Sequence, residues 1–167
     1  MSFVIHLGVA DIPYRQALPP QQRRSARWRH RIRPWQRLGG LTTTGDVAEI
    51  LEKRYGLFSQ FSVLHGADIV AAVENAMSGK LENLLLGHGS LDAAIFADGD
   101  LSDVEATFRR SIDDRDYDSR LPGVPTRAAQ RGVNHRLARP YAKGNPPRPS
   151  FLDTGAVQAN FRAWVTE

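Results

Sequence analysis

The chain has 167 residues, of which 41% are hydrophobic, 24% are charged and none is cysteine, and its formal net charge is +4. The lack of cysteine excludes disulfides and thiolate metal sites, and no apolar run approaches the 18 or so residues of a membrane-spanning helix, so we expect no membrane partner. The length favours a single domain over residues 1–167, with a core of its own.

The charge is divided along the chain. Residues 1–45 carry eight arginines and one aspartate, residues 46–118 carry six basic and fifteen acidic side chains, and residues 119–167 carry eight basic and two acidic ones. Such segments favour surfaces that attract nucleic acid or that pair head-to-tail with further copies of the chain. The alternative is that the basic ends fold back onto the acidic middle.

The first predicted element is a strand over residues 2–12, which are rich in β-branched and apolar side chains and end at Pro13. Residues 15–40, the arginine-rich segment, follow with eight arginines, no acidic residue, and Pro-Pro and Gly-Gly pairs. Mutual repulsion and the scarcity of apolar side chains favour an extended arm or a long loop within the domain.

Apolar residues then recur at helical spacing as far as residue 85. Asp46, with Glu49 three residues later, predicts a capping box at the start of this region. Gly56 and Gly66 predict a break, so the region forms either one long kinked helix or two helices in series. Gly87 follows the last apolar positions and predicts the end of the region.

A second S-x-x-E pattern, from Ser102 to Glu105, predicts another capped helix, and residues 125–137 predict one more. The tail alternates apolar and polar residues from Phe161, which predicts a final strand. We therefore expect an α+β fold, in which the N- and C-terminal strands form a small antiparallel sheet packed on the long amphipathic helix. The core expected from this arrangement comprises Phe3, Ile5, Leu51, Phe58, Val73, Met77, Phe161 and Trp164.

Residues 151–156 read FLDTGA, the pattern of the active-site loop of retroviral-type aspartic proteases. Such enzymes need two carboxylates that share a proton, with strands, a flap and a helix following the aspartate. Because twelve residues follow Gly155 in this sequence, we do not expect that fold to be completed. We interpret Asp153, Thr154 and Gly155 as a structural turn, in which Asp153 caps a short helix.

Patterns for bound ions and cofactors are incomplete. The five histidines lack metal-binding spacing. Asp114, Asp116 and Asp118 imitate the start of a calcium loop, but Ser119 replaces its glycine and Pro125 replaces its last glutamate. Walker-type phosphate loops and nucleophile elbows are also incomplete. We expect no catalytic residue, no metal and no cofactor, and therefore no enzyme.

The arginine-rich segment is the main candidate binding region. Clustered positive charge suffices for phosphate contacts, but no nucleic-acid-binding motif accompanies it, so sequence-specific readout is not expected. Tryptophan among arginines suits base stacking and protein interfaces equally. The candidate subunit-interface or DNA-channel residues are Arg23, Arg24, Arg27, Trp28, Arg29, Arg31, Arg33 and Trp35.

The C-terminal quarter combines motifs in a characteristic order. Arg148-Pro149, Phe151-Leu152, Asp153-Thr154-Gly155, Val157, Asn160 and the strand from Phe161 to Val165 follow Asn134-His135-Arg136-Leu137. This order resembles neck and tail-completion proteins of long-tailed double-stranded-DNA bacteriophages. The clear part spans residues 123–165, and a weaker likeness covers residues 2–12 and 43–86. The arginine-rich segment has no counterpart in the resemblance.

The resemblance implies a non-enzymatic structural subunit of the virion, located at the head–tail neck or the tail end and assembled in the host cytoplasm. It implies a ring, in that class of six copies, around the DNA channel. The implied partners are further copies of the chain, neighbouring neck and tail proteins and, without specificity, the genomic DNA. The alternative function is a basic nucleic-acid-binding accessory protein.

Overall fold

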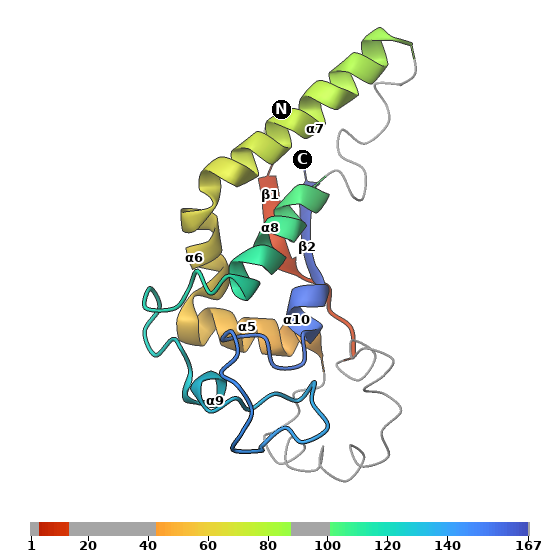
Figure 1. The fold of residues 1–167 in the computed structure, drawn as a ribbon. Coiled ribbons are helices and arrows are strands. Elements are labelled where there is room, and N and C mark those ends of the chain that lie inside the picture. Colours follow the sequence, from red (N-terminus) through yellow and green to blue (C-terminus); the bar gives the residue numbers. More distant parts are fainter. Residues whose placement is uncertain (1–3, 14–42, 88–100, 167) are drawn as a thin grey trace.

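The computed structural model describes residues 4–13, 43–87 and 101–166 (Figure 1). The elements in chain order are β1 (Val4–Val9), α5 (Thr44–Tyr55), α6 (Leu57–Leu64), α7 (Gly66–Leu85), α8 (Ser102–Asp113), α9 (Arg127–Gln130), α10 (Ala156–Ala159) and β2 (Phe161–Thr166). Helices α5 and α6 and strands β1 and β2 surround α8, and α7 projects away from this body (Figure 1). The α+β class predicted from the sequence is confirmed.

The two terminal strands form the predicted antiparallel sheet. β1 pairs with β2 in a register that runs from Val4 opposite Thr166 to Val9 opposite Phe161. α8 packs along β2 on the inner side of this sheet. The long helix α7 contributes two buried residues, Ile69 and Ala72, both from its first half. The sheet therefore rests on α8 more than on the long helix.

The helical region begins and breaks differently from the prediction. The capping box joins Thr43 and Asp46, because the Thr43 hydroxyl accepts from the Asp46 amide at 3.2 Å and the Asp46 carboxylate accepts from the Thr43 amide at 3.1 Å. The predicted box between Asp46 and Glu49 is therefore wrong by three residues, because Thr43 is the N-cap and Asp46 occupies N3. Breaks at both Gly56 and His65 divide the region into three helices rather than one or two.

The two later helix predictions also need correction. Leu101 occupies the N-cap of α8 without a side-chain cap, and Glu105 pairs with Arg109 at 2.7 Å instead of closing the predicted box with Ser102. The helix predicted over residues 125–137 is shortened to the four residues of α9. It ends before Gly132, which has a φ of +66° and lies so close to Asn145 that a Cβ there would overlap its carbonyl. Tertiary packing therefore stops this helix.

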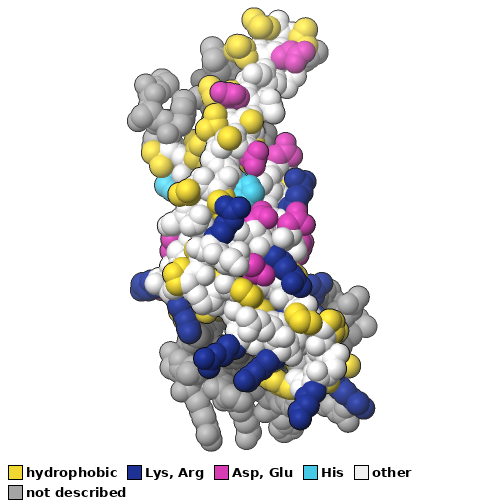
Figure 2. Space-filling model, turned by 60° about the vertical axis from the view of Figure 1, so that its left-hand side comes forward, with side chains coloured by type: hydrophobic (Ala, Val, Ile, Leu, Met, Phe, Trp, Pro, Cys, Tyr) yellow, Lys and Arg dark blue, Asp and Glu magenta, His cyan; other side chains and the backbone are white. Residues whose placement is uncertain are grey.

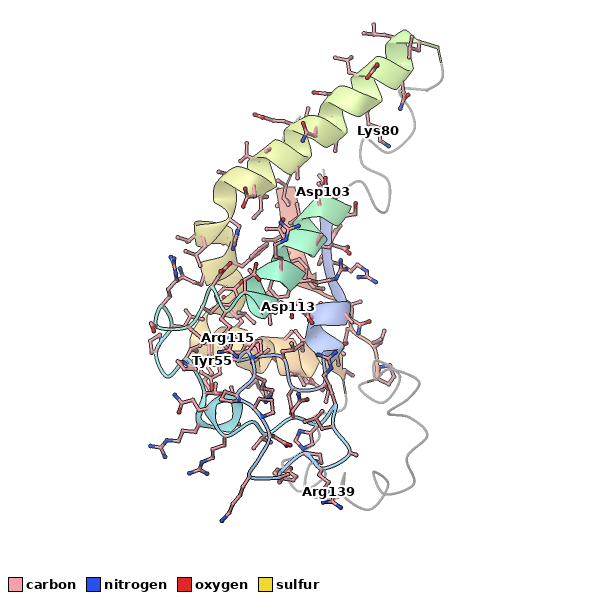
Figure 3. The ribbon with its side chains drawn as sticks, in the orientation of Figure 1. Tyr55, Lys80, Asp103, Asp113, Arg115 and Arg139 are labelled. Carbon is pink, nitrogen blue, oxygen red and sulfur yellow. The ribbon has the colours of Figure 1, made fainter. Side chains whose placement is uncertain are left out.

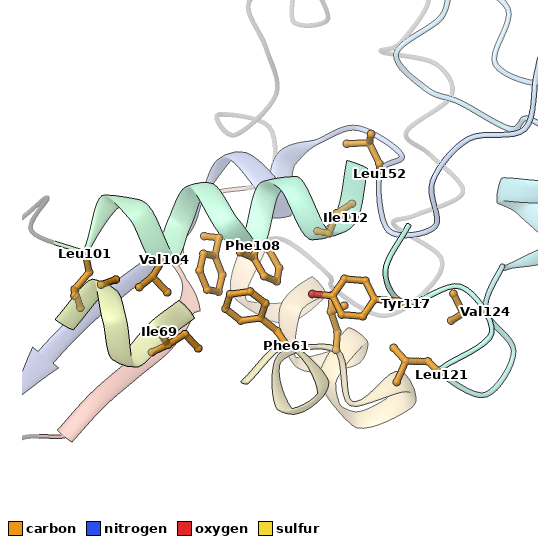
Figure 4. Packing of buried hydrophobic residues seen from close by; sticks show 13 residues of the cluster. Phe61, Ile69, Leu101, Val104, Phe108, Ile112, Tyr117, Leu121, Val124 and Leu152 are labelled. Atoms are coloured by element: carbon orange, nitrogen blue, oxygen red, sulfur yellow. The ribbon is translucent and has the colours of Figure 1, made fainter. Parts of the chain in front are cut away.

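The core is centred on phenylalanine rings from α6, α8 and β2 (Figure 4). Phe108 and Phe161 stack with ring centroids 3.8 Å apart, and Phe61 meets both rings edge-on at 5.1 and 5.7 Å. Aromatic pairs of this kind contribute about 0.5–1.5 kcal/mol each beyond the burial of their area. The surrounding buried residues are Leu57, Ile69, Ala72, Leu101, Val104, Ile112, Tyr117, Leu121, Val124 and Leu152.

The predicted core is partly correct. Phe161 is fully buried, and Leu51, Phe58 and Val73 pack against the core, whereas Phe3 lies outside the described residues. Three further predictions are wrong, because Ile5, Met77 and Trp164 are 37%, 47% and 45% exposed. A strand has a period of two, so residues 161, 163 and 165 face inward and Trp164 must face outward, where it stacks on His6.

Candidate functional site

The candidate interface residues of the arginine-rich segment lie outside the described part of the chain. These are Arg23, Arg24, Arg27, Trp28, Arg29, Arg31, Arg33 and Trp35. Their role as subunit-interface or DNA-channel residues stays a prediction. Two features of the described residues bear on function instead: the DTG turn with its partners, and the distribution of charge and apolar surface.

Asp153, Thr154 and Gly155 form the bend that leads into α10. Gly155, with a φ of +79°, occupies the N-cap of that helix, and the Thr154 hydroxyl accepts a hydrogen bond from the Ala156 amide at 3.3 Å. The prediction that the Asp153 side chain caps the helix is therefore wrong. Its carboxylate points to His135, which lies 18 residues earlier in the chain.

Asp153 is the centre of a polar cluster that we call the Asp153 clamp, formed with His135, Tyr141 and Arg148. The carboxylate accepts from the His135 backbone amide at 3.1 Å, and its two oxygens lie 2.8 and 2.7 Å from His135 Nδ1. Arg148 Nη2 lies 3.4 Å from the carboxylate, and Nε of the same side chain donates to the carbonyl of Val133. His135 Nε2 lies 2.8 Å from the Tyr141 hydroxyl.

The electrostatics of the clamp favour a permanent carboxylate. Burial by itself raises the pKa of Asp153, but hydrogen bonds from the ring and amide of His135 and the positive charges of His135 and Arg148 outweigh it, so the pKa lies below its usual range. Burial lowers the pKa of Arg148, and the charge of Asp153 opposes this effect. An aspartic protease needs a carboxyl that retains a proton, so this geometry suits a fixed structural anion.

The clamp joins three separate pieces of the loop-rich C-terminal region. A carboxylate facing Nδ1 sets the His135 ring so that Nε2 points at Tyr141, which is 62% exposed. Sequence analysis identified Asp153 and Arg148 within one motif, but it did not connect them to His135 or Tyr141. The available signal was the presence of His135, Arg148 and Asp153 within the motif order of the C-terminal quarter, and in the structure His135 and Arg148 both contact Asp153.

The basic side chains and the projecting helix lie at opposite ends of the molecule (Figure 2). Lys and Arg side chains gather over its lower part, Asp and Glu over its middle and upper part, and hydrophobic side chains follow the projecting helix. Residues 119–149 contain seven basic residues and no acidic one. We call their exposed basic side chains the basic loop face: Arg120, Arg127, Arg131, Arg136, Arg139 and Lys143.

The projecting helix α7 carries the largest exposed apolar feature on any described helix. Val70, Met77, Leu81 and Leu85, which we call the apolar stripe, are between 47% and 79% exposed. Figure 3 shows α7, labelled at Lys80, at the end of the molecule opposite to Arg139. An apolar stripe on a helix indicates a face that packs against another element.

A surface hollow of about 660 Å³ lies beside the sheet, between the end of β1, the start of β2 and α8. Its charged lining is already paired, since Glu105 contacts Arg109 at 2.7 Å and Arg162 at 3.3 Å, and Asp11 accepts from the Gly45 amide at 3.1 Å. The hollow therefore offers little unsatisfied polarity with which to recognise a small molecule.

Over the described residues, no three metal-ligating side chains converge, the aspartates at 114, 116 and 118 included. No helix within the same ranges is long and apolar enough to cross a membrane. Comparison of the chain with protein-family models, curated proteins and solved structures gives no match. The features of the chain that bear on function are therefore its motif order and the surfaces described above.

Proposed function

We propose that the chain is a structural subunit of a tailed-phage virion, which forms a ring at the head–tail neck or the tail end around the DNA channel. The motif order over residues 123–165 motivates this proposal. The proposed partners are further copies of the chain, neighbouring neck and tail proteins and, without sequence specificity, the DNA that passes through the channel. No enzymatic step is part of the proposed role.

One observation carries the proposal: the basic loop face and the apolar stripe lie at opposite ends of the molecule (Figures 2 and 3). Two different and complementary patches favour heterologous association, which closes into a ring when the rotation between neighbouring copies allows it. A monomer rarely leaves a helix exposed with an apolar stripe along it, since exposed apolar patches mark interaction sites.

The alternative is a nucleic-acid-binding accessory protein, and the basic loop face is the observation that favours it. Six exposed basic side chains in a region without acidic residues suffice for phosphate contacts. This alternative leaves the apolar stripe of α7 without a role. A subunit around a channel must also release the passing DNA, so we assign most of this charge to contacts between proteins.

Two measurements separate these functions. Light scattering coupled to size-exclusion chromatography, followed by negative-stain microscopy, should find a ring of defined copy number, and an antibody against the chain should label the neck or tail end of purified particles. DNA binding should be weak at physiological salt. A monomer that binds DNA with a steep salt dependence, together with unlabelled particles, would replace this proposal with the accessory-protein function.

A further inference from the structure

We propose that the apolar stripe of α7 in one copy binds the loop at residues 134–145 of the next copy. The proposal names both surfaces of the ring contact, and it rests on the self-assembly in the proposed function. The contact pairs apolar and acidic residues on α7 with apolar and basic residues on the loop.

Within the described residues, helix α7 is covered only near its start. Its 20 residues span roughly 30 Å, and its buried residues are Ile69 and Ala72, near its start. Helices of this length are marginal in water when little packs against them, because most helical stability in proteins comes from tertiary packing. The remainder of α7 therefore gains stability from any partner that covers the apolar stripe.

The stripe is narrow and contains a carboxylate. At about 100° per residue, Val70, Met77, Leu81 and Leu85 fall within an arc of about 80°, and Glu74 lies inside that arc. Glu82 and Lys80 each lie about 60° beyond the arc, on opposite sides of it, so Glu74 is the charged residue within the stripe. The stripe therefore requires a partner that offers apolar side chains together with positive charge.

The loop at residues 134–145 presents that combination. Arg136, Leu137 and Arg139 are all exposed at its tip, and Tyr141 beside them is 62% exposed. Two arginines flank a leucine, and a tyrosine lies close to them in sequence. Tyrosine and arginine are the residues that most often dominate binding at protein interfaces.

This loop is ordered by its own hydrogen bonds. Asn145 donates to the carbonyls of Arg139 and Pro140 at 2.9 and 3.1 Å, and the Asn134 amide donates to the carbonyl of Pro140 at 3.1 Å. The Asp153 clamp holds the first end of the loop through His135. A surface that is already ordered loses less conformational entropy on binding, so it suits a docking role.

Geometry and charge favour a second copy as the partner. The stripe and the loop lie at opposite ends of one molecule, so α7 does not reach the loop of its own copy (Figure 3). Pairing of α7 with α7 would bring together two acidic helices, because each carries three acidic residues, Asp68, Glu74 and Glu82, and a single basic residue, Lys80. Docking on the 134–145 loop instead places Arg136 and Arg139 against Glu74 and Glu82, which steers the association.

The test uses two charge-reversed variants. The helix variant carries Glu74→Lys and Glu82→Lys, and the loop variant carries Arg136→Glu and Arg139→Glu. Each alone should weaken self-association about tenfold or more, measured by analytical ultracentrifugation. Their equimolar mixture should assemble again with the two variants in a 1:1 ratio, because the intact helix of the loop variant fits the intact loop of the helix variant and the two reversed surfaces also carry opposite charges.

Controls make each outcome decisive. Circular dichroism must show native folding, and Lys53→Glu with Arg54→Glu, the same charge change on exposed residues of α5 outside both proposed surfaces, should leave assembly unchanged. Normal self-association of the loop variant would refute the contact. The stripe would then bind another surface, such as α7 of a second copy. If the same variant lost DNA binding, the loop arginines would serve DNA and not assembly. A monomeric wild type would also refute the contact, whereas particle labelling would still test the virion role independently.

Discussion

Replacing the carboxylate of Asp153 with an amide isolates the energetic role of the clamp. In Asp153→Asn, the remaining oxygen still accepts from the His135 amide, but the charged contacts to the His135 ring and Arg148 are lost. Hydrogen bonds to charged groups contribute about 1.5–3 kcal/mol. Because the Asp153 side chain is 34% exposed, solvent screens part of this contribution, and we expect a loss of about 1–2 kcal/mol in the free energy of unfolding.

Urea denaturation followed by circular dichroism measures this loss, and thermal melting should show a decrease of about 2–8 °C in Tm. The pH dependence identifies its origin. A carboxyl whose folded pKa is lowered stabilises the protein above its unfolded pKa, and this stabilisation is lost as the pH falls through the folded pKa. The difference between wild type and variant should shrink below about pH 4, as the carboxyl of Asp153 takes up a proton.

Asp114→Asn is the matched control. Asp114 is exposed at the C-cap of α8, where a negative charge is unfavourable, so its removal should be neutral or slightly stabilising. Equal stability of wild type and Asp153→Asn at pH 7 would refute the assigned role of the clamp. A difference that persisted undiminished at pH 2.5 would show that the loss arises from packing and not from charge.

Three further predictions concern the core and the loops. Phe161→Ala should cost about 3–5 kcal/mol in urea denaturation, whereas Trp164→Ala should cost less than half as much because Trp164 is 45% exposed; equal losses would contradict the assigned sheet faces. Gly132→Ala should cost more than about 1 kcal/mol in the same assay, because it combines a positive φ with an overlap on Asn145, and an unchanged midpoint would contradict this. Burial raises the pKa of Tyr117 to about 12, so stability should fall from about pH 10 upward, and the ultraviolet absorbance should show a step near pH 12 that Tyr117→Phe lacks.

The sequence predicted element types better than it predicted their ends. The terminal strands and the helices at residues 44–85 and 102–113 follow from apolar periodicity, which survives tertiary packing because it reflects burial. The capping residues do not follow from periodicity. Several acidic and hydroxyl side chains near a helix start can cap it, and the backbone geometry decides which one does. At the start of α8, the ion pairs of Glu105 with Arg109 and Arg162 take the side chain that the predicted capping box needed.

The error at Trp164 has a different cause. Size and apolarity suggested burial, but strand periodicity cannot place both Phe161 and Trp164 on the inner face. The periodicity was visible in the sequence and should have outweighed side-chain size. The clamp was less accessible, because the contact between Asp153 and His135 joins loops whose path has no periodic signal.

The clamp and the proposed contact give the motif order a physical explanation. Asp153 and Arg148 come from the region around the DTG turn, while His135 begins the loop whose tip carries Leu137. A loop without regular structure presents a defined binding surface when hydrogen bonds fix both its ends, because the ordering entropy is then lost in folding rather than in binding. The charged Asp153 in this turn therefore holds the 134–145 loop in place through His135, and the loop in turn forms one side of the contact that we propose.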